Sequence, residues 1–258
     1  MKKIFSVVIT VVLSFLIINC SNSSSNSETD LETEPPVSSQ ITTYYDSPTN
    51  AVVTYCDISP FTTTFIAPEI ADGYYQCAVF ANRYDKIPVG SAVEIAANGK
   101  TIKCLVTDYS PAGSSIGNGF FDLERSAFEY LSDLSVGPLP VIFKTIPYST
   151  DENIKIKSRN NTNEYYLDFI IYNMRYPLKK VELSTDGGVN FYNMNMPEHF
   201  NFINLSVAST GGVQFGFGAN NLTYFRLTDI YNQVVTASVA LTSADADVIY
   251  DLGVNFNY

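Results

Sequence analysis

Short β-prone runs separated by turn residues fill this chain of 258 residues from about residue 41 to its end. In SAVEIAANGKTIKCLVTD, two such runs are joined by Asn98-Gly99, a strong signal for a two-residue hairpin turn. After STDEN, six more runs follow at short spacing: YYLDFIIY, LKKVELS, VNFYNM, GGVQFGFG, LTYFRLTD and NQVVTASVAL. This rhythm predicts a mainly β protein whose second half, of about a hundred residues, is an antiparallel sandwich.

One segment of the first half has helical rather than strand periodicity. LERSAFEYLSDL places five apolar side chains on one face of a helix, namely Leu123, Ala127, Phe128, Leu131 and Leu134. PLPVIFKTIPY then predicts a strand that closes the first half, and the pattern resets near residues 148–153. We therefore expect one domain at residues 40–149 and a second at residues 150–258.

The N-terminal segment MKKIFSVVITVVLSFLIINC predicts export. Two lysines precede an apolar run from Ile4 to Ile18, which has the anatomy of a secretory signal and is short for a membrane span. The LIINC ending resembles a bacterial lipobox, so we expect residues 1–20 to be a lipoprotein signal and Cys20 to carry a lipid at the periplasmic or cell surface membrane. A plain signal peptide of a secreted protein and an uncleaved anchor are the alternatives. Residues 21–39 are Ser-rich and predict a flexible tether.

The charge of the chain excludes one class of partner. Its formal net charge is −11, and the exported part has 13 basic and 26 acidic residues, because Lys2 and Lys3 lie in the signal. Such a surface repels nucleic acid and other anionic polymers at long range, whereas a neutral ligand meets no such barrier.

The remaining cysteines and the single histidine offer no recognisable catalytic or metal motif. Cys56, Cys77 and Cys104 allow at most one internal disulfide in an oxidising compartment, and the sequence leaves all three pairings open. The chain has no CxxC, HExxH or Gly-x-Ser-x-Gly motif, and His199 stands in a turn before Phe200. We expect neither a metal site nor a cofactor.

Motifs in both halves together resemble those of bacterial expansins. TTYYD is similar to the opening strand of that family, and VTDYSP…FDLERSAF to its VTD-x-x-P…LDLS-x-x-AF signature. In the second half, NIKIKSRNNTNEYYLDFIIYNMRYPLKKVEL, EHF and FRLTD are similar to landmarks of the family's second domain. The resemblance covers about residues 40–258. It implies a six-stranded double-psi β-barrel followed by an immunoglobulin-like β-sandwich that is a carbohydrate-binding module.

The resemblance also implies a groove on the barrel. Carried over residue by residue, the groove contains Thr43, Asp108 and Asp122. Glycoside hydrolysis uses two carboxyl groups, and expansins resemble glycosidases that lack the base, so binding without hydrolysis is implied. Two structural interpretations compete with this one: Asp122 as the N-cap of the helix, and Asp108 as a residue that bonds its own turn. Ser110 departs from the tyrosine that is common there. Tyr109, one residue earlier, is a candidate for contact with the glycan, but it should point to the opposite side unless the turn rotates it.

A second binding surface is implied on the sandwich. Tyr165 and Tyr166 occupy the position of the family's paired aromatic residues, whose flat faces stack on sugar rings. Because successive side chains of a strand point to opposite faces, both tyrosines can face a ligand only at a bulge or a strand end. The alternative interpretation is that one tyrosine lies in the core and the other is exposed. Phe200 or Tyr192 is the candidate for a third aromatic residue, and Lys157 for a hydrogen bond to the glycan.

The function implied is binding and loosening of a cell-wall polysaccharide by a monomer, without hydrolysis. Cellulose, a xyloglucan-like glucan and peptidoglycan all stay open as the partner, and the lipid anchor would attach the protein to a membrane. Two other functions fit the same residues. One is a lytic transglycosylase of the rare lipoprotein A type. One carboxylic acid suffices for that reaction, because a hydroxyl group of the substrate itself attacks and no base is needed to activate water. The other is a surface adhesin without catalytic activity.

Overall fold

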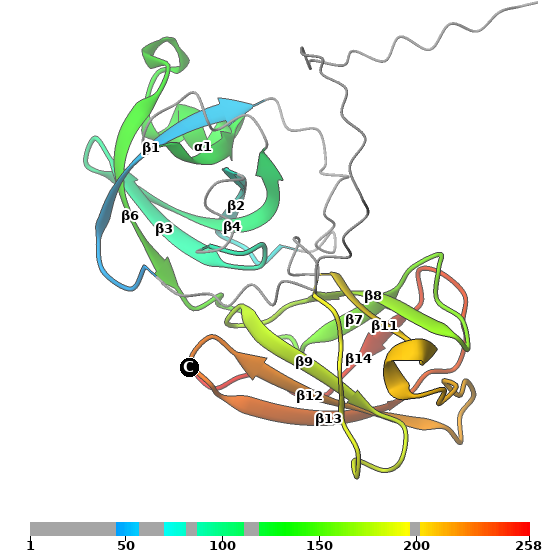
Figure 1. The fold of residues 1–258 in the computed structure, drawn as a ribbon. Helices are drawn as coiled ribbons and strands as arrows, with labels where there is room; N and C mark the ends of the chain where they lie inside the picture. Colours follow the sequence, from blue (N-terminus) through cyan, green and yellow to red (C-terminus); the bar gives the residue numbers. More distant parts are fainter. Residues whose placement is uncertain (1–44, 57–69, 81–86, 111–118, 197–201) are drawn as a thin grey trace, which may run out of the picture. The chain divides into compact units, whose positions relative to one another are not determined.

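The structure, a computed structural model, describes residues 45–56, 70–80, 87–110, 119–196 and 202–258 (Figure 1). Within these ranges, the first half forms a closed barrel with the strand order β1-β5-β2-β4-β3-β6. The second half forms two four-stranded sheets. The predicted mainly β architecture, a six-stranded barrel followed by a sandwich, is confirmed. Among the described residues, no helix has both the length and the apolar character needed to cross a membrane.

The described barrel strands are β1 (Thr49–Cys56), β2 (Tyr74–Phe80), β3 (Ala92–Ala97), β4 (Lys100–Ser110), β5 (Gly119–Glu124) and β6 (Leu139–Ile146). They are accompanied by helix α1 (Arg125–Leu131) and the 3-10 turn η2 (Leu134–Val136). Strand β1 pairs with β5 in parallel, and so does β2 with β4, while the other neighbouring pairs are antiparallel. The two parallel pairs, β1 with β5 and β2 with β4, match the predicted double-psi topology.

Local sequence explains two features of the barrel. Asn98 and Gly99 both have positive φ, 52° and 73°, which is the conformation that a two-residue hairpin turn requires between β3 and β4. Helix α1 buries Ala127, Phe128 and Leu131 against the barrel, as its periodicity predicts. Leu123 belongs to β5 instead and is fully buried there.

The opening strand differs from the prediction. The first described strand, β1, begins at Thr49, and Tyr45 and Asp46 of the TTYYD segment precede it without forming a strand. The Tyr45 ring instead packs against Phe120 and Phe143 of the barrel core, with ring centroids 5.6 and 5.2 Å away. The barrel therefore takes its first strand from TNAVVTYC, whose alternating burial fits a strand with one face on the core.

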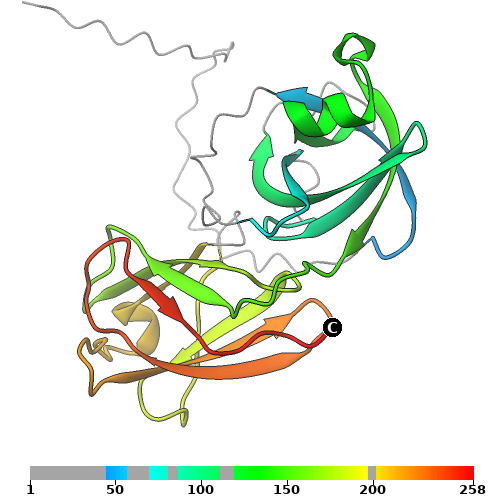
Figure 2. The ribbon, with the colours of Figure 1, turned by 180° about the vertical axis from the view of Figure 1, so that it is seen from behind.

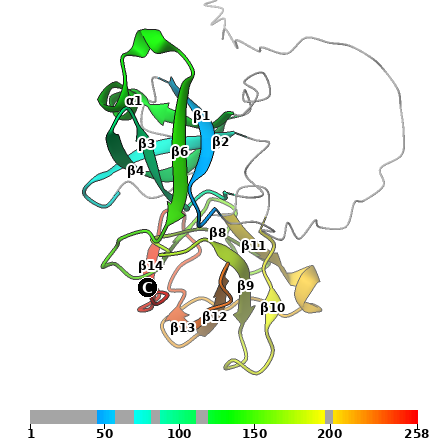
Figure 3. The same ribbon diagram turned by 90° about the vertical axis from the view of Figure 1, so that its left-hand side faces the viewer.

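One described sheet of the sandwich has the order β11-β8-β7-β14, and the other has the order β10-β9-β12-β13. The strands of the first are β7 (Lys155–Ser158), β8 (Tyr166–Tyr172), β11 (Phe202–Ser206) and β14 (Ile249–Asp251), and β14, drawn in red, forms one edge (Figure 2). Those of the second are β9 (Leu178–Ser184), β10 (Tyr192–Asn193), β12 (Leu222–Asp229) and β13 (Val234–Ala240), and β9, β12 and β13 lie side by side (Figure 3). A 3-10 turn, η3 (Val207–Thr210), follows β11.

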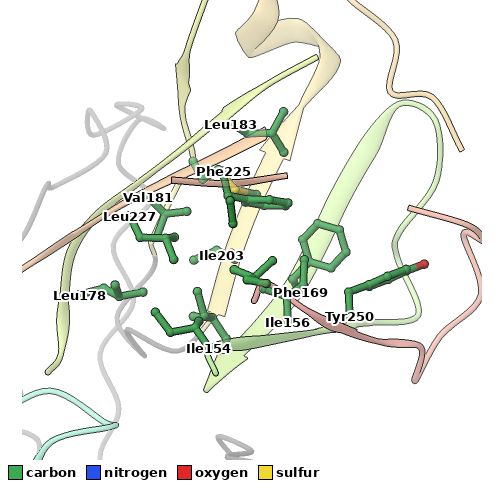
Figure 4. Packing of buried hydrophobic residues seen from close by; sticks show 14 of the residues in the cluster. Ile154, Ile156, Phe169, Leu178, Val181, Leu183, Ile203, Phe225, Leu227 and Tyr250 are labelled. Atoms are coloured by element: carbon green, nitrogen blue, oxygen red, sulfur yellow. The ribbon is translucent and has the colours of Figure 1, made fainter. Parts of the chain in front are cut away.

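The core of the sandwich lies between its two sheets. Ile156 and Phe169 project from the first sheet toward Val181, Phe225 and Leu227 of the second (Figure 4), and all five are fully buried. Alternation along β8 and β12 aims every second side chain at this core. Contact between the two apolar faces is what stabilises a sandwich.

One predicted strand of this half is wrong. The run GGVQFGFG, at residues 211–218, forms no strand, although its Phe215 side chain is buried in the core. Gly211, Gly212 and Gly218 have positive φ, which a strand excludes. The backbone N–H of Phe215 donates a hydrogen bond to the carbonyl of Glu164, a loop residue. This N–H group therefore has a partner without belonging to a β-sheet.

Candidate functional site

The two aspartates predicted for the barrel groove lie in one row across neighbouring strands. Asp122 of β5 is opposite Ala78 of β2, and Ala78 is opposite Asp108 of β4. On its other side, Asp122 is opposite Thr54 of β1. Residues that are directly opposite one another in a sheet share a face. The fold therefore places Thr54, Asp122, Ala78 and Asp108 in one row, which we call the aspartate row.

The aspartate row lies on the outer face of the barrel. The sequence neighbours of its members point into the core and are fully buried: Val53, Cys77, Val79, Phe121 and Leu123. Because successive side chains of a strand alternate between faces, the members of the row point outward. Both aspartates are partly exposed, and Ala78 between them is 5% exposed. Small Ala78 leaves space between the two carboxylates.

A β-bulge gives Asp108 its outward direction. The pairing of β2 with β4 runs from Cys77 opposite Val106 to Ala78 opposite Asp108, so Thr107 is an extra residue on β4. Without the bulge, Asp108 would share the inward direction of Val106, which lies in the barrel core. Bulges commonly re-aim a side chain in this way.

Asp122 is held by a contact with the opening strand. The Thr54 hydroxyl donates a hydrogen bond of 2.8 Å to Oδ1 of Asp122. The alternative of Asp122 as helix N-cap is wrong, because the N-cap position of α1 is Glu124, whose side chain makes no capping bond. The Glu124 carboxylate instead accepts hydrogen bonds from the backbone N–H of Gln76 and the hydroxyl of Ser126.

Asp108 keeps part of its structural role. Its Oδ1 accepts a hydrogen bond of 2.7 Å from the backbone N–H of Tyr109, so the carboxylate bonds the local backbone, although Asp108 lies in β4 and not in a turn. Tyr109 itself is opposite Val79, a core residue, and its ring packs against the barrel core. The tyrosine that sequence reasoning offered as a candidate for contact with the glycan therefore points away from the aspartate row.

The spacing of the row defines what its carboxylates can do. Asp108 and Asp122 are separated by two inter-strand steps, or about 10 Å between Cα atoms. Side chains on the outside of a barrel diverge from one another, so the two carboxyl groups do not approach more closely by pointing outward. A pair with this spacing suits hydrogen bonds to hydroxyl groups on two sides of one bound chain, with Thr54 fixing the direction of the Asp122 carboxylate.

The paired tyrosines of the sandwich lie at a strand end. Residues Asn163 to Tyr166 form a turn closed by a 2.7 Å bond from the N–H of Asn163 to the carbonyl of Tyr166. Tyr165 is on this turn and is 54% exposed. Tyr166 begins β8, and because Leu167 points into the core, Tyr166 points to the outer face. Neither tyrosine is in the core, so the interpretation with one of them in the core is wrong.

Lys157 lies on the same outer face as Tyr166. It is opposite Ile170 of β8 and Ile249 of β14, and its ammonium is 2.7 Å from an oxygen of Asp247. Burial raises the pKa of the Tyr166 phenol, and the nearby carboxylate of Asp168 raises it further.

Sequence reasoning missed a polar cluster on this face. Asp168 is 2% exposed, and its carboxylate accepts a hydrogen bond of 3.1 Å from Nη1 of Arg159. The Arg159 guanidinium lies 4.4 Å from the ring centroid of Phe202, a cation–π contact. The alternation of β8 indicates an outward Asp168. The sequence did not predict the other two members of the cluster, because Arg159 lies in a loop and Phe202 belongs to β11, whose pairing with β8 was not predicted.

Three predicted site residues lie outside the part of the chain that the structure describes, namely Cys20, Thr43 and Phe200. His199, for which no catalytic role is predicted, lies outside it too. Sequence reasoning also missed Thr54, although it alternates with the core residue Val53 in a β-prone run. Within the described residues, no group of three or more His, Cys, Asp or Glu side chains could hold a metal ion.

A six-stranded barrel followed by a sandwich is the architecture that the resemblance to expansins implies, and relatives found by sequence and by structure agree with it. No family model matches the chain. Expansin-like protein 1 of Dictyostelium discoideum is 27% identical over 192 residues, which are 72% of this chain and 63% of that protein. Expansin-YoaJ of Bacillus subtilis is 24% identical over 151 residues, or 58% of each chain. The chain thus spans less than two thirds of the length of these relatives.

The fold is shared with a solved expansin. The structure of a Clavibacter michiganensis expansin variant in complex with cellohexaose matches with a TM-score of 0.66 over 82% of this chain and 99% of that one, at 16% identity. The ligand-free structure of that expansin matches equally well. Sequence and fold together confirm the resemblance to expansins.

Proposed function

We propose that this chain binds a cell-wall polysaccharide through the aspartate row of its barrel and does not hydrolyse it. The observation that carries the proposal is the row itself, in which Thr54, Asp122, Ala78 and Asp108 are in register on the outer face of four strands. The contact between Thr54 and Asp122 links the first strand of the barrel to the carboxylate that the family resemblance singles out.

The spacing of the row supports binding without hydrolysis. A retaining glycosidase holds its two carboxyl groups roughly 5–5.5 Å apart, and an inverting one roughly 6.5–9.5 Å apart. Asp108 and Asp122 are about 10 Å apart at their Cα atoms, and their side chains diverge on a convex surface. This spacing is wider than that of a retaining pair, and we propose that one carboxylate at a time contacts a glycosidic bond. Each is placed instead to accept hydrogen bonds from sugar hydroxyl groups.

The sandwich supplies the second part of the proposed function. Tyr165, exposed on its turn, and Tyr166, on the outer face of β8, present aromatic rings to a glycan. Aromatic faces stack on the apolar faces of sugar rings at a low cost in conformational entropy. We propose that this tyrosine pair anchors the protein to the polysaccharide while the barrel holds one chain.

A neutral β-glucan is the ligand we propose first, and peptidoglycan second. The net charge of −11 favours uncharged chains, and a related fold has been solved in complex with cellohexaose. Export, lipidation at Cys20 and a monomeric state stay predictions from the sequence.

The proposal is tested by co-sedimentation of the protein with microcrystalline cellulose and with purified peptidoglycan. We expect depletion from the supernatant onto at least one pellet, weakened in the double variant Tyr165→Ala, Tyr166→Ala. The variant Tyr258→Ala removes a tyrosine that is 65% exposed but not part of either proposed site, and it should bind normally. Absence of binding to both pellets would favour a protein that has kept this fold for another purpose.

A further inference from the structure

A concave surface lies on the barrel, away from the aspartate row. It is a cleft of about 650 Å³ lined by Asp72, Gly73, Tyr74, Tyr75, Glu94, Thr101, Ile102, Lys103 and Tyr130. These residues come from the turn before β2, from the starts of β2 and β4, from β3 and from α1. Ala78 and Asp108, in contrast, lie near the ends of β2 and β4. Four residues of strand separate Tyr74 from Ala78, or about 13 Å. The two sites are therefore distinct, and we call this one the tyrosine cleft.

One wall of the tyrosine cleft is a fixed aromatic ring. The Tyr74 hydroxyl accepts a hydrogen bond of 3.1 Å from the backbone N–H of Ser149, and its ring packs edge-on against Tyr148 at 5.1 Å. Lys103, directly opposite Tyr74, has its ammonium 5.7 Å from the centroid of that ring. A ring held from two sides loses little conformational entropy when a ligand stacks on it.

The helix contributes a second ring that has no part in the core. Tyr130 is 49% exposed, while the buried residues of α1 are Ala127, Phe128 and Leu131. Lys100 reaches over the Tyr130 ring at 5.4 Å and donates a hydrogen bond to the Tyr130 carbonyl. Lys100 therefore covers one face of the ring, and the exposed part of the ring borders the cleft.

The polar groups of the cleft select against anions. Asp72 and Glu94 supply two carboxylates and Lys103 one ammonium, and Glu94 also pairs with Lys144 at 3.2 Å. Thr101 adds a hydroxyl group at the exposed start of β4. Donors, acceptors and tyrosine rings in a concave surface of this size are what a sugar ligand requires, since small-ligand sites occupy about 300–1,000 Å³.

We propose that the tyrosine cleft is an additional binding site for an uncharged oligosaccharide, in which rings stack on Tyr74 and Tyr130 and hydroxyl groups bond Asp72, Glu94 and Lys103. This inference rests on the proposed function, because it assumes that the protein binds neutral glycans. The cleft would hold a second chain, or a side branch, while the aspartate row holds the first.

Methyl NMR of the isoleucine-labelled protein tests the proposal site by site. Ile102 lines the cleft, and Ile249 lies beside Lys157 on the sandwich, so the two methyl signals report on separate surfaces. On titration with cellohexaose, we expect the Ile102 signal to shift and saturate. The shift should need about tenfold more ligand in Tyr130→Ala and recover in Tyr130→Phe, which keeps the ring. An acidic oligogalacturonate should cause no shift.

The outcomes separate this inference from the proposed function. Shifts confined to Ile249, with Ile102 unchanged, would overturn the cleft and leave glycan binding by the sandwich intact. A shift of Ile102 that persists unaltered in Tyr130→Ala would also overturn it. No shift of any methyl group with cellohexaose or with a soluble peptidoglycan fragment would overturn both the cleft and the tyrosine pair, and the co-sedimentation assay would then decide on the aspartate row.

Discussion

The hydroxyl of Thr54 and the carboxylate of Asp122 are joined by a 2.8 Å hydrogen bond between two parallel strands of the barrel. The two residues are 68 positions apart in the chain, so only the closed barrel brings them together. The bond leaves the Asp122 side chain with a defined direction on the outer face. A binding group whose direction is fixed in advance loses less entropy when a ligand arrives.

Replacement of Thr54 by valine tests this contact. Thr54→Val keeps the branched shape and removes the donor, so we expect the free energy of unfolding to change by only about 1 kcal/mol, while glycan binding weakens several-fold. Thr236→Val, on an exposed strand position of the sandwich, is the matched control. Denaturant titration and a binding isotherm measure the two effects. Equal binding by Thr54→Val and Thr236→Val would show that the Thr54 bond is not used in binding.

The tyrosine pair is expected to act through stacking rather than through its hydroxyl groups. Tyr165→Phe and Tyr166→Phe keep the rings and should retain most of the affinity for an insoluble glucan, whereas Tyr165→Ala should lose about tenfold. Tyr165 is 54% exposed, so none of these changes at Tyr165 should lower stability noticeably. A loss of affinity in Tyr165→Phe equal to that in Tyr165→Ala would assign the binding to the hydroxyl group instead.

The second sheet of the sandwich carries a buried acid whose charge stabilises the fold. Glu182 is 5% exposed, and its two oxygens accept bonds of 2.6 and 2.7 Å from Arg226, with Lys180 also 2.7 Å away. Arg226 lowers the pKa of Glu182, and the Lys180 ammonium lowers it further. The Arg226 side chain is 37% exposed, so solvent screening limits the gain from the pair.

The sign of the pH effect follows from the lowered pKa. Glu182 contributes its stability at pH values above about 4.3, the ordinary pKa of a glutamate, and loses it as the pH falls through the lower pKa of the folded state. We expect Glu182→Gln to lower the free energy of unfolding by about 1–2 kcal/mol at pH 7 and by less at pH 3. Thermal unfolding at the two pH values measures this, and a loss that grows toward pH 3 would contradict it.

The thiols of the barrel core should be inert in the folded protein. Cys77 and Cys104 are both fully buried, and burial raises the pKa of the Cys77 thiol, with Cys104 beside it adding to the increase. The thiolate is therefore favoured only in the unfolded chain, so stability is full below about pH 8.5 and is lost as the pH rises beyond it. We expect both thiols to react with an alkylating reagent at pH 8 in denaturant and not in buffer. Equal rates in the two conditions would contradict the buried positions.

Much of the fold was predictable because local signals determine it. Asn98-Gly99 predicted the hairpin of β3 and β4 through the positive φ that both residues adopt. The periodicity of LERSAFEYLSDL predicted α1, although Leu123 ends up in β5. The strand predicted for GGVQFGFG is wrong although Phe215 does lie in the core, as a strand residue would. Glycines on either side of Phe215 have positive φ, which excludes a strand.

The candidate site was only partly predictable because two of its features depend on pairing between distant strands. The outward direction of Asp108 comes from the extra residue Thr107, and a bulge is invisible in the sequence of β4 alone. Thr54 was missed because the resemblance to the opening strand was assigned to TTYYD, whereas the first described strand of the barrel is TNAVVTYC. The register that sets Thr54 opposite Asp122 is a property of the closed barrel.

The most direct test of the central claim compares the chain from Ser38 onward with its Asp122→Asn variant on cellulose and on peptidoglycan. Each protein is incubated with each polymer, the pellet is assayed for bound protein, and the supernatant is examined by mass spectrometry. We predict that the unmodified protein enters a pellet, that Asp122→Asn binds more weakly, and that neither releases soluble fragments. Cello-oligosaccharides, or anhydro-muropeptides as a lytic transglycosylase would produce, appearing only with the unmodified protein would contradict the account and make Asp122 a catalytic acid.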